Sequence, residues 1–134
     1  MRATGHETAA AALICLAALA TPATAQTPEQ QLAYCNNRDG QFAPDLVISG
    51  CTAHIQSGRL DTRNLATILF NRGNGYFDQR DYPRAIADYS EAIRLNPRFA
   101  NAYSNRALAY EELGDHARAA ADHANAAGPA PPGH

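Results

Sequence analysis

The chain has 134 residues, of which 11 are basic and 13 acidic, so its formal net charge is −2. This length suits one small domain. Every basic residue is an arginine, and the arginines are dispersed along the chain. The sequence therefore lacks the basic patch expected of a protein that binds nucleic acid or an anionic membrane surface.

Residues 1–25 are predicted to be a targeting segment. Arg2 precedes an apolar run from Ala9 to Ala20, and Ala23-Thr24-Ala25 forms an A-x-A cleavage site. This order is typical of a secretory signal peptide, and a run of about a dozen residues is too short to span a bilayer. We therefore expect cleavage after Ala25, a periplasmic or secreted mature chain, and no membrane insertion of that chain.

Three cysteines become two if the signal peptide is removed. Cys15 lies in the apolar run, which leaves Cys35 and Cys51. An even pair in an exported chain favours a disulfide. Thiol catalysis has less support, because there is no C-x-x-C motif and neither cysteine has an obvious base beside it in sequence.

Residues 26–60 are predicted to form two helices joined by a loop. Thr27-Pro28-Glu29 combines a capping residue, a proline and an acid, which is typical of a helix start, and this helix ends near Asn36. The second helix runs from Pro44 to about Gln56, with apolar residues at helical spacing. Each helix carries one cysteine, so a disulfide would staple the pair.

The rest of the chain is duplicated with a period of 34 residues. The shift superposes Asn71-Arg72 on Asn105-Arg106, Tyr76 on Tyr110, Asp81 on Asp115, Arg84-Ala85 on Arg118-Ala119, Asp88 on Asp122 and Ala92 on Ala126. A fixed period in this range indicates stacked repeats, each a single supersecondary unit. Each copy is predicted to be two antiparallel helices, bounded as follows: Asp61 to Gln79, Asp81 to Asn96, Arg98 to Leu113, and Asp115 to Ala127.

Single residues support these boundaries. Asp61, Asp81 and Asp115 are candidate N-caps, and proline after Asn96 ends the second helix. Gly73 weakens its helix by about 1 kcal/mol relative to alanine, so a close approach of the paired helix is the simplest explanation for it.

These units resemble the tetratricopeptide repeat (TPR). The family's marker positions carry Leu69, Gly73, Tyr76, Ala85, Tyr89, Ala92 and Pro97 in the first copy, and Tyr103, Ala107, Tyr110, Ala119, His123 and Ala126 in the second. The resemblance implies an all-α fold: a short right-handed α-solenoid of about three antiparallel helix pairs. In it, residues 61–97 and 98–127 are TPR units, and 26–60 are a degenerate pair that supplies the third unit needed for a continuous core.

The order of features adds a finer resemblance. A cysteine-bearing lead-in, then Cys51-Thr52-Ala53, then Gly58 and the repeats is similar to the order in exported bacterial tetratricopeptide proteins. The Pro/Gly-rich tail, residues 128–134, cannot be helical and is expected to be disordered.

The resemblance also implies a concave face, lined by the first helix of each pair, that binds a protein or peptide. Carried over by position, the candidate contact residues are Phe70, Asn71, Asn74, Asn101, Ser104 and Asn105. An amide offers a donor and an acceptor, so it can hold a peptide main chain without selecting its sequence. The alternative is that these are merely solvated polar positions. The lysines with which some relatives grip a C-terminal carboxylate have no counterpart here.

Two further groups of polar residues have competing interpretations. Arg72 and Arg106 recur with the period and could grip an acidic partner, but pairing with Asp88 and Asp122 to fix the stacking register is favoured. His54, His116 and His123 lack metal-ligand spacing, so we expect no metal. His123 occupies a packing position and is expected to fill the core.

No catalytic motif is present in the sequence, so we expect neither enzymatic activity nor a cofactor. The leading hypothesis is an exported scaffold that binds a partner along its concave face. The alternative is a self-assembling subunit, because the last helix has an Ala-rich outer face in place of a polar capping surface. An enzymatic hypothesis rests only on the histidines and the two cysteines.

Overall fold

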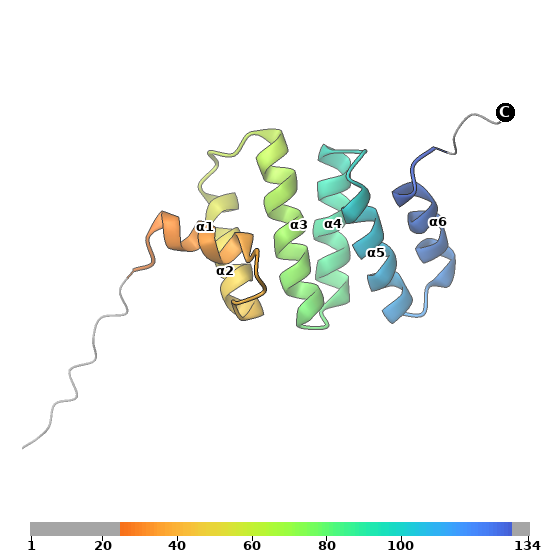
Figure 1. Cartoon of the computed structure of the whole chain (residues 1–134), viewed down its shortest axis with the longest axis horizontal. Helices are drawn as coiled ribbons and strands as arrows, with labels where there is room; N and C mark the ends of the chain where they lie inside the picture. Colours follow the sequence, from red (N-terminus) through yellow and green to blue (C-terminus); the bar gives the residue numbers. More distant parts are fainter. Residues whose placement is uncertain (1–24, 130–134) are drawn as a thin grey trace, which may run out of the picture.

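The computed structural model describes residues 25–129, which form six α-helices. They are α1 (Pro28–Asn36), α2 (Pro44–Gln56), α3 (Thr62–Asp78), α4 (Tyr82–Leu95), α5 (Ala100–Glu112) and α6 (His116–Ala126). Figure 1 shows α3, α4, α5 and α6 side by side in chain order, with α1 lying across α2 at the other end.

Three antiparallel helix pairs make up the stack. Each helix packs against the next, and the first helices of successive pairs, α1, α3 and α5, also contact one another. The second helices, α2, α4 and α6, do not contact one another. The face formed by the first helices is therefore the concave side, and the predicted short, all-helical solenoid is confirmed.

The helix starts follow from local caps. At α1, the Thr27 hydroxyl accepts from the Gln30 N–H at 3.2 Å, while the Thr27 N–H donates to Gln30 Oε1 at 2.9 Å. This reciprocal pair satisfies two backbone donors that a helix N-terminus otherwise leaves open. Asp61, Asp81 and Asp115 each accept a hydrogen bond from the N–H three residues later. The predicted caps of α1, α3, α4 and α6 are confirmed.

The start of α5 differs from the prediction. This helix begins at Ala100 instead of near Arg98. The Phe99 N–H donates to the Asn96 carbonyl oxygen at 3.0 Å, which closes a turn around the proline before the helix can begin.

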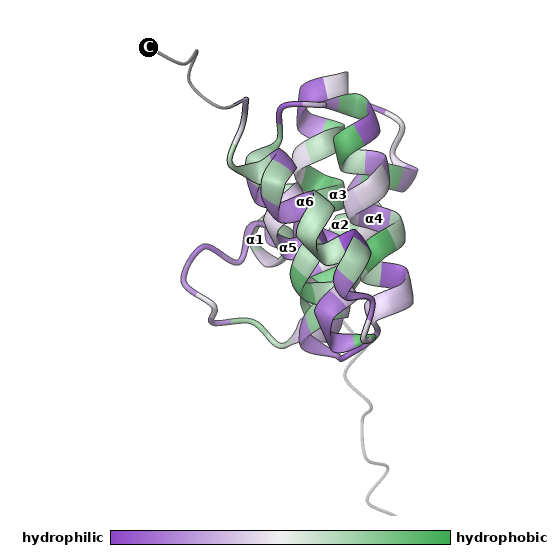
Figure 2. Cartoon of the chain, turned by 90° about the vertical axis from the view of Figure 1, so that its right-hand side faces the viewer, coloured by the Kyte–Doolittle hydropathy of each residue, from purple (hydrophilic) through white to green (hydrophobic). Residues whose placement is uncertain are grey.

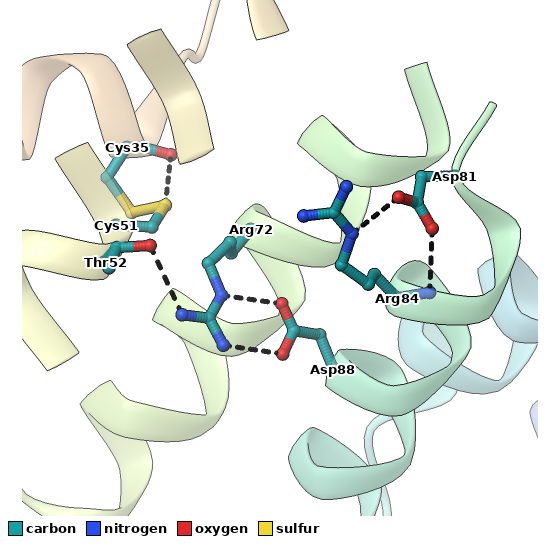
Figure 3. Close-up of polar contacts among 7 residues, drawn as sticks. All are labelled: Cys35, Cys51, Thr52, Arg72, Asp81, Arg84 and Asp88. Carbon is teal, nitrogen blue, oxygen red and sulfur yellow. Dashed lines mark hydrogen bonds and ion pairs between the residues drawn. A yellow bond between two sulfur atoms is a disulfide. The ribbon is translucent and has the colours of Figure 1, made fainter. Parts of the chain in front are cut away.

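The first helix pair is joined by the predicted disulfide. Cys35 of α1 and Cys51 of α2 are bonded and have Cα atoms 4.6 Å apart (Figure 3). Both are fully buried, in a cluster that includes Ile68 of α3. At Gly50 the helices approach so closely that a Cβ atom would collide with the Gln31 carbonyl oxygen. The disulfide therefore joins the two helices of the first pair in the interior, and the cluster around it packs this pair against α3.

A second close approach lies inside the first repeat. A Cβ atom at Gly73 would lie 2.7 Å from Cε1 of Tyr89, whose side chain is completely buried, so the predicted close packing is confirmed. In the second copy, Ala107 and His123 take these places. The prediction that His123 fills the core is wrong: it is exposed, with Nε2 2.9 Å from Glu111 Oε1. Ala107 is buried, and its methyl group stands at the position where the Tyr89 ring leaves no room for one in the first copy.

The last helix, α6, buries only Ala119 and Asp122. Figure 2, which views the stack from this end, shows hydrophilic and weakly hydrophobic residues alternating along α6. None of the helices within residues 25–129 is both long and apolar enough to cross a membrane. The expected signal peptide, apart from Ala25, and residues 130–134 of the tail lie outside the described residues.

Candidate functional site

The concave side carries a groove lined mainly by polar residues. Two adjoining cavities, of about 70 and 320 Å³, share Asn37, Asn74 and Asp78. The smaller cavity reaches Asn71, and the larger one reaches Asn105. The groove thus runs from the end of α1 across α3 to α5. We call it the amide groove, after Asn37, Asn71, Asn74 and Asn105.

Asn74 is the centre of the hydrogen bonding in this groove. Its Oδ1 accepts from the Tyr89 hydroxyl at 2.8 Å and from Asn105 Nδ2, also at 2.8 Å. These bonds tie α3 to α4 and α5. No hydrogen bond within residues 25–129 engages Asn74 Nδ2 or Asn105 Oδ1, so the linked pair keeps one donor and one acceptor for a partner.

Tyr89 holds this arrangement in one orientation. Burial raises the pKa of the Tyr89 hydroxyl, a hydrogen bond with the Asn105 side chain lowers it in part, and the nearby carboxylates of Asp78 and Asp88 raise it further. Like any tyrosine the hydroxyl is protonated at neutral pH, and it donates to Asn74. Because this donor needs an acceptor opposite it, the Asn74 amide presents Oδ1 to Tyr89 and leaves Nδ2 for another contact.

Half of the predicted contact residues line the amide groove: Asn71, Asn74 and Asn105. Phe70 lines neither cavity: it is half-buried, and its ring centroid lies 4.9 Å from that of Phe99 and 5.9 Å from that of Tyr89. Asn101 is exposed and Ser104 is half-buried on α5. Neither lines the two cavities, so the structure does not bring all six residues together.

The sequence analysis missed Asn37. It precedes Asn71 by the same 34 residues that separate Asn71 from Asn105, so extending the shift toward the N-terminus would have found it. Asn37 ends α1 with a left-handed φ of 31°, and its Oδ1 accepts from the Phe42 N–H at 2.9 Å. One groove amide therefore recurs in each helix pair, including the degenerate first one.

Arg72 and Arg106 are engaged in ion pairs. Arg72 Nε and Nη2 donate to the two oxygens of Asp88 at 2.7 and 2.8 Å, and Nη1 donates to Thr52 Oγ1 at 3.3 Å (Figure 3). Arg106 makes the same two-pronged contact with Asp122 and also donates to a serine of α4. Both aspartates are buried. The predicted pairing of these arginines with Asp88 and Asp122 is confirmed.

The histidines do not come together. His54 lies on α2, where its Nε2 is buried and has no hydrogen-bond partner among the described residues. His116 and His123 lie on α6. Within residues 25–129, no group of three or more His, Cys, Asp or Glu residues is placed to hold a metal ion.

Comparisons with known proteins agree with the helix-pair repeats. Residues 73–114 match the family model described as TPR repeat. Hsp70-Hsp90 organizing protein 3 from Arabidopsis thaliana is 54% identical over 43 residues, which are 32% of this chain and 8% of that protein. Serine/threonine-protein phosphatase 5 from Homo sapiens is 52% identical over 42 residues, which are 31% of this chain and 8% of that protein.

Among solved structures, MamA superposes with a TM-score of 0.63 at 24% identity, over 75% of this chain and 57% of that one. This likeness concerns the fold alone. The matched segment covers less than a tenth of the length of the organizing protein and of the phosphatase. Residues 73–114 are thus similar to the TPR repeat, and the chain has the fold of a short all-helical solenoid.

Proposed function

We propose that this chain is an exported scaffold that binds an extended segment of a partner protein in the amide groove. The observation that carries the proposal is the linked pair Asn74 and Asn105, which Tyr89 holds with one donor and one acceptor unengaged. A peptide main chain needs this combination, because each residue offers one N–H and one C=O. The Hsp70-Hsp90 organizing proteins, which share the repeat, are named for organising other proteins.

The groove amides also have a suitable arrangement. Asn37, Asn71 and Asn105 recur once per helix pair, and the two cavities that they line adjoin. Regularly placed amides can follow an extended segment along the face of a stack. Such contacts read the main chain, so we expect them to supply affinity more than sequence preference.

Export is the second part of the proposal. The buried bridge between Cys35 and Cys51 supports it, because structural disulfides persist mainly in oxidising compartments. The test is to express the full chain, separate the cell fractions and sequence the N-terminus of the protein. We expect a mature chain that starts at Gln26 outside the cytosol; an uncleaved cytosolic chain with free thiols would contradict export.

The groove is tested by an Asn71→Ala/Asn105→Ala double variant in a pull-down from the envelope fraction. We expect the variant to lose the proteins that the wild type captures, because both amides line the groove, while its far-UV circular dichroism stays unchanged. Asn125→Ala is the matched control, since Asn125 is an exposed asparagine on α6, away from the groove. Equal capture by all three proteins would refute binding through the groove.

The alternative is self-assembly through α6. Leu113, at the end of α5, is 52% exposed, which favours it. The exposed residues of α6 include alanines at 117, 120, 121 and 124, each of which offers little apolar area. We therefore place the groove first. A concentration-independent monomer mass in light scattering would reject the alternative, whereas a dimer that Leu113→Ser dissociates would support it.

A further inference from the structure

The amide groove has one sign of charge. Asp78 lines both of its cavities, and no arginine or histidine lines either one. Asp78 is also the last residue of α3, where the helix dipole adds a partial negative charge. Within residues 25–129, the charged side chain that lines these cavities is therefore a carboxylate.

No arginine of residues 25–129 lines the groove. Arg38 and Arg80, which lie close to Asn37 and Asp78 in sequence, are exposed and line neither cavity. Arg72 and Arg106, from the same helices that line the groove, are held by Asp88 and Asp122. Among the ion pairs found within residues 25–129, none includes Asp78. The Asp78 carboxylate is exposed and remains available to a cation from outside the chain.

An apolar contact lies in the same groove. Leu108 is 43% exposed and lines the larger cavity together with Phe77, Asp78 and Asn105. A leucine in a cleft can cover an aliphatic side chain of a ligand. The larger cavity thus offers an amide, a carboxylate and an aliphatic surface within one space of about 320 Å³.

Building on the proposed function, we propose that the amide groove selects extended peptides that carry a lysine or arginine close to an aliphatic residue. The amides hold the main chain, Asp78 binds the basic side chain, and Leu108 covers the aliphatic one. Acidic segments are disfavoured, because they bring a like charge to Asp78 and find no cation on the groove wall.

The test starts with a display library of random dodecapeptides, selected in parallel on the purified wild-type chain and on the Asn71→Ala/Asn105→Ala variant. We expect wild-type selection to enrich lysine or arginine next to leucine, isoleucine or valine. The most enriched peptide is then synthesised and titrated by fluorescence anisotropy against single variants. Asp78→Asn should weaken its binding about two- to five-fold, the range for an exposed ion pair.

Glu112→Gln is the matched control. Glu112 stands 34 residues after Asp78, at the end of α5, and lines neither cavity. We expect it to leave the affinity unchanged. A third variant, Asp78→Arg, should reverse the preference toward acidic peptides.

The outcomes separate this inference from the proposed function. Enrichment that depends on Asn71 and Asn105 but favours acidic peptides, or that Asp78→Asn leaves unchanged, overturns the inference and leaves groove binding intact. Enrichment that is the same on wild type and double variant, or no enrichment at all, overturns both.

Discussion

Gly73→Ala tests whether the aromatic ring of Tyr89 dictates the glycine. In an exposed helix interior, alanine in place of glycine gains about 1 kcal/mol of stability. Here the added Cβ would lie 2.7 and 2.8 Å from two ring carbons of Tyr89, which is completely buried and cannot swing away. Overpacking of this kind costs about 1–3 kcal/mol. Contact this short places the cost at the upper end, so we expect a net loss of about 1–2 kcal/mol.

A double-mutant cycle isolates that contact. In a Tyr89→Ala background the ring is absent, so Gly73→Ala should stabilise the protein by about 0.5–1 kcal/mol through helix propensity alone. The assay is urea unfolding of all four proteins, followed by circular dichroism at 222 nm. The sign of the Gly73→Ala effect should differ between the two backgrounds. A stabilising effect of equal size in both would refute the close-packing explanation.

Three further predictions concern the bridge, the buried ion pairs and the pH dependence. Cys35→Ala/Cys51→Ala should lower the free energy of unfolding by about 3 kcal/mol, since the bridge closes a loop between residues 16 positions apart; urea midpoints that match those of the oxidised wild type would contradict this. Arg72→Ala leaves a buried carboxylate unpaired and should cost about 3–5 kcal/mol, whereas Arg94→Ala, from an exposed pair, should cost about 1 kcal/mol or less in the same assay. Hydrogen bonds from the side chain and backbone N–H of the arginine three residues later lower the pKa of Asp81. The stability that the Asp81 carboxylate contributes is therefore present above about pH 4 and is lost as the pH falls through the lowered pKa. Asp81→Asn keeps the cap and should flatten the fall of the urea midpoint between neutral and acidic pH; an unchanged slope would count against this carboxylate.

The helices were predictable from sequence because their signals are local. A cap, a proline or a glycine acts within one turn, so the starts at Asp61, Asp81 and Asp115 could be assigned without tertiary information. The 34-residue period then predicted that the helix pairs repeat and stack. The start of α5 was missed by two residues, because the turn before it depends on a backbone hydrogen bond of Phe99 that leaves no clear sequence pattern.

The candidate site was less predictable, because it depends on contacts between units. Phe70 occupies a position that the repeat pattern places on the concave face, but its half-buried ring packs against Phe99 from the next unit and lines neither cavity. The prediction that His123 is buried was wrong because it treated each marker position separately. In the second copy, Ala107 replaces Gly73 and His123 replaces Tyr89. Because a methyl group at the glycine position would overlap an aromatic ring packed there, the two replacements together indicate that the His123 ring lies outside the core.

The negative charge in the groove could not be predicted from the local sequence either. Asp78 lies at the end of a helix and, in sequence, looks like any solvated acid. Only the fold brings it beside Asn37 from another helix pair and shows that Arg72, on the same helix as Asp78, is paired with Asp88.

The disulfide gives the two ends of the stack unequal resistance to opening. Repeat stacks are held by contacts between neighbours, so each unit can separate only from a free end. The bridge between Cys35 and Cys51 prevents α1 from separating from α2, whereas α6 contacts only α5 and has no covalent tie to it. Amide protons should therefore exchange with solvent first in α6 and last around the bridge, and a partner seated on α3 and α5 would slow exchange most at the weaker end.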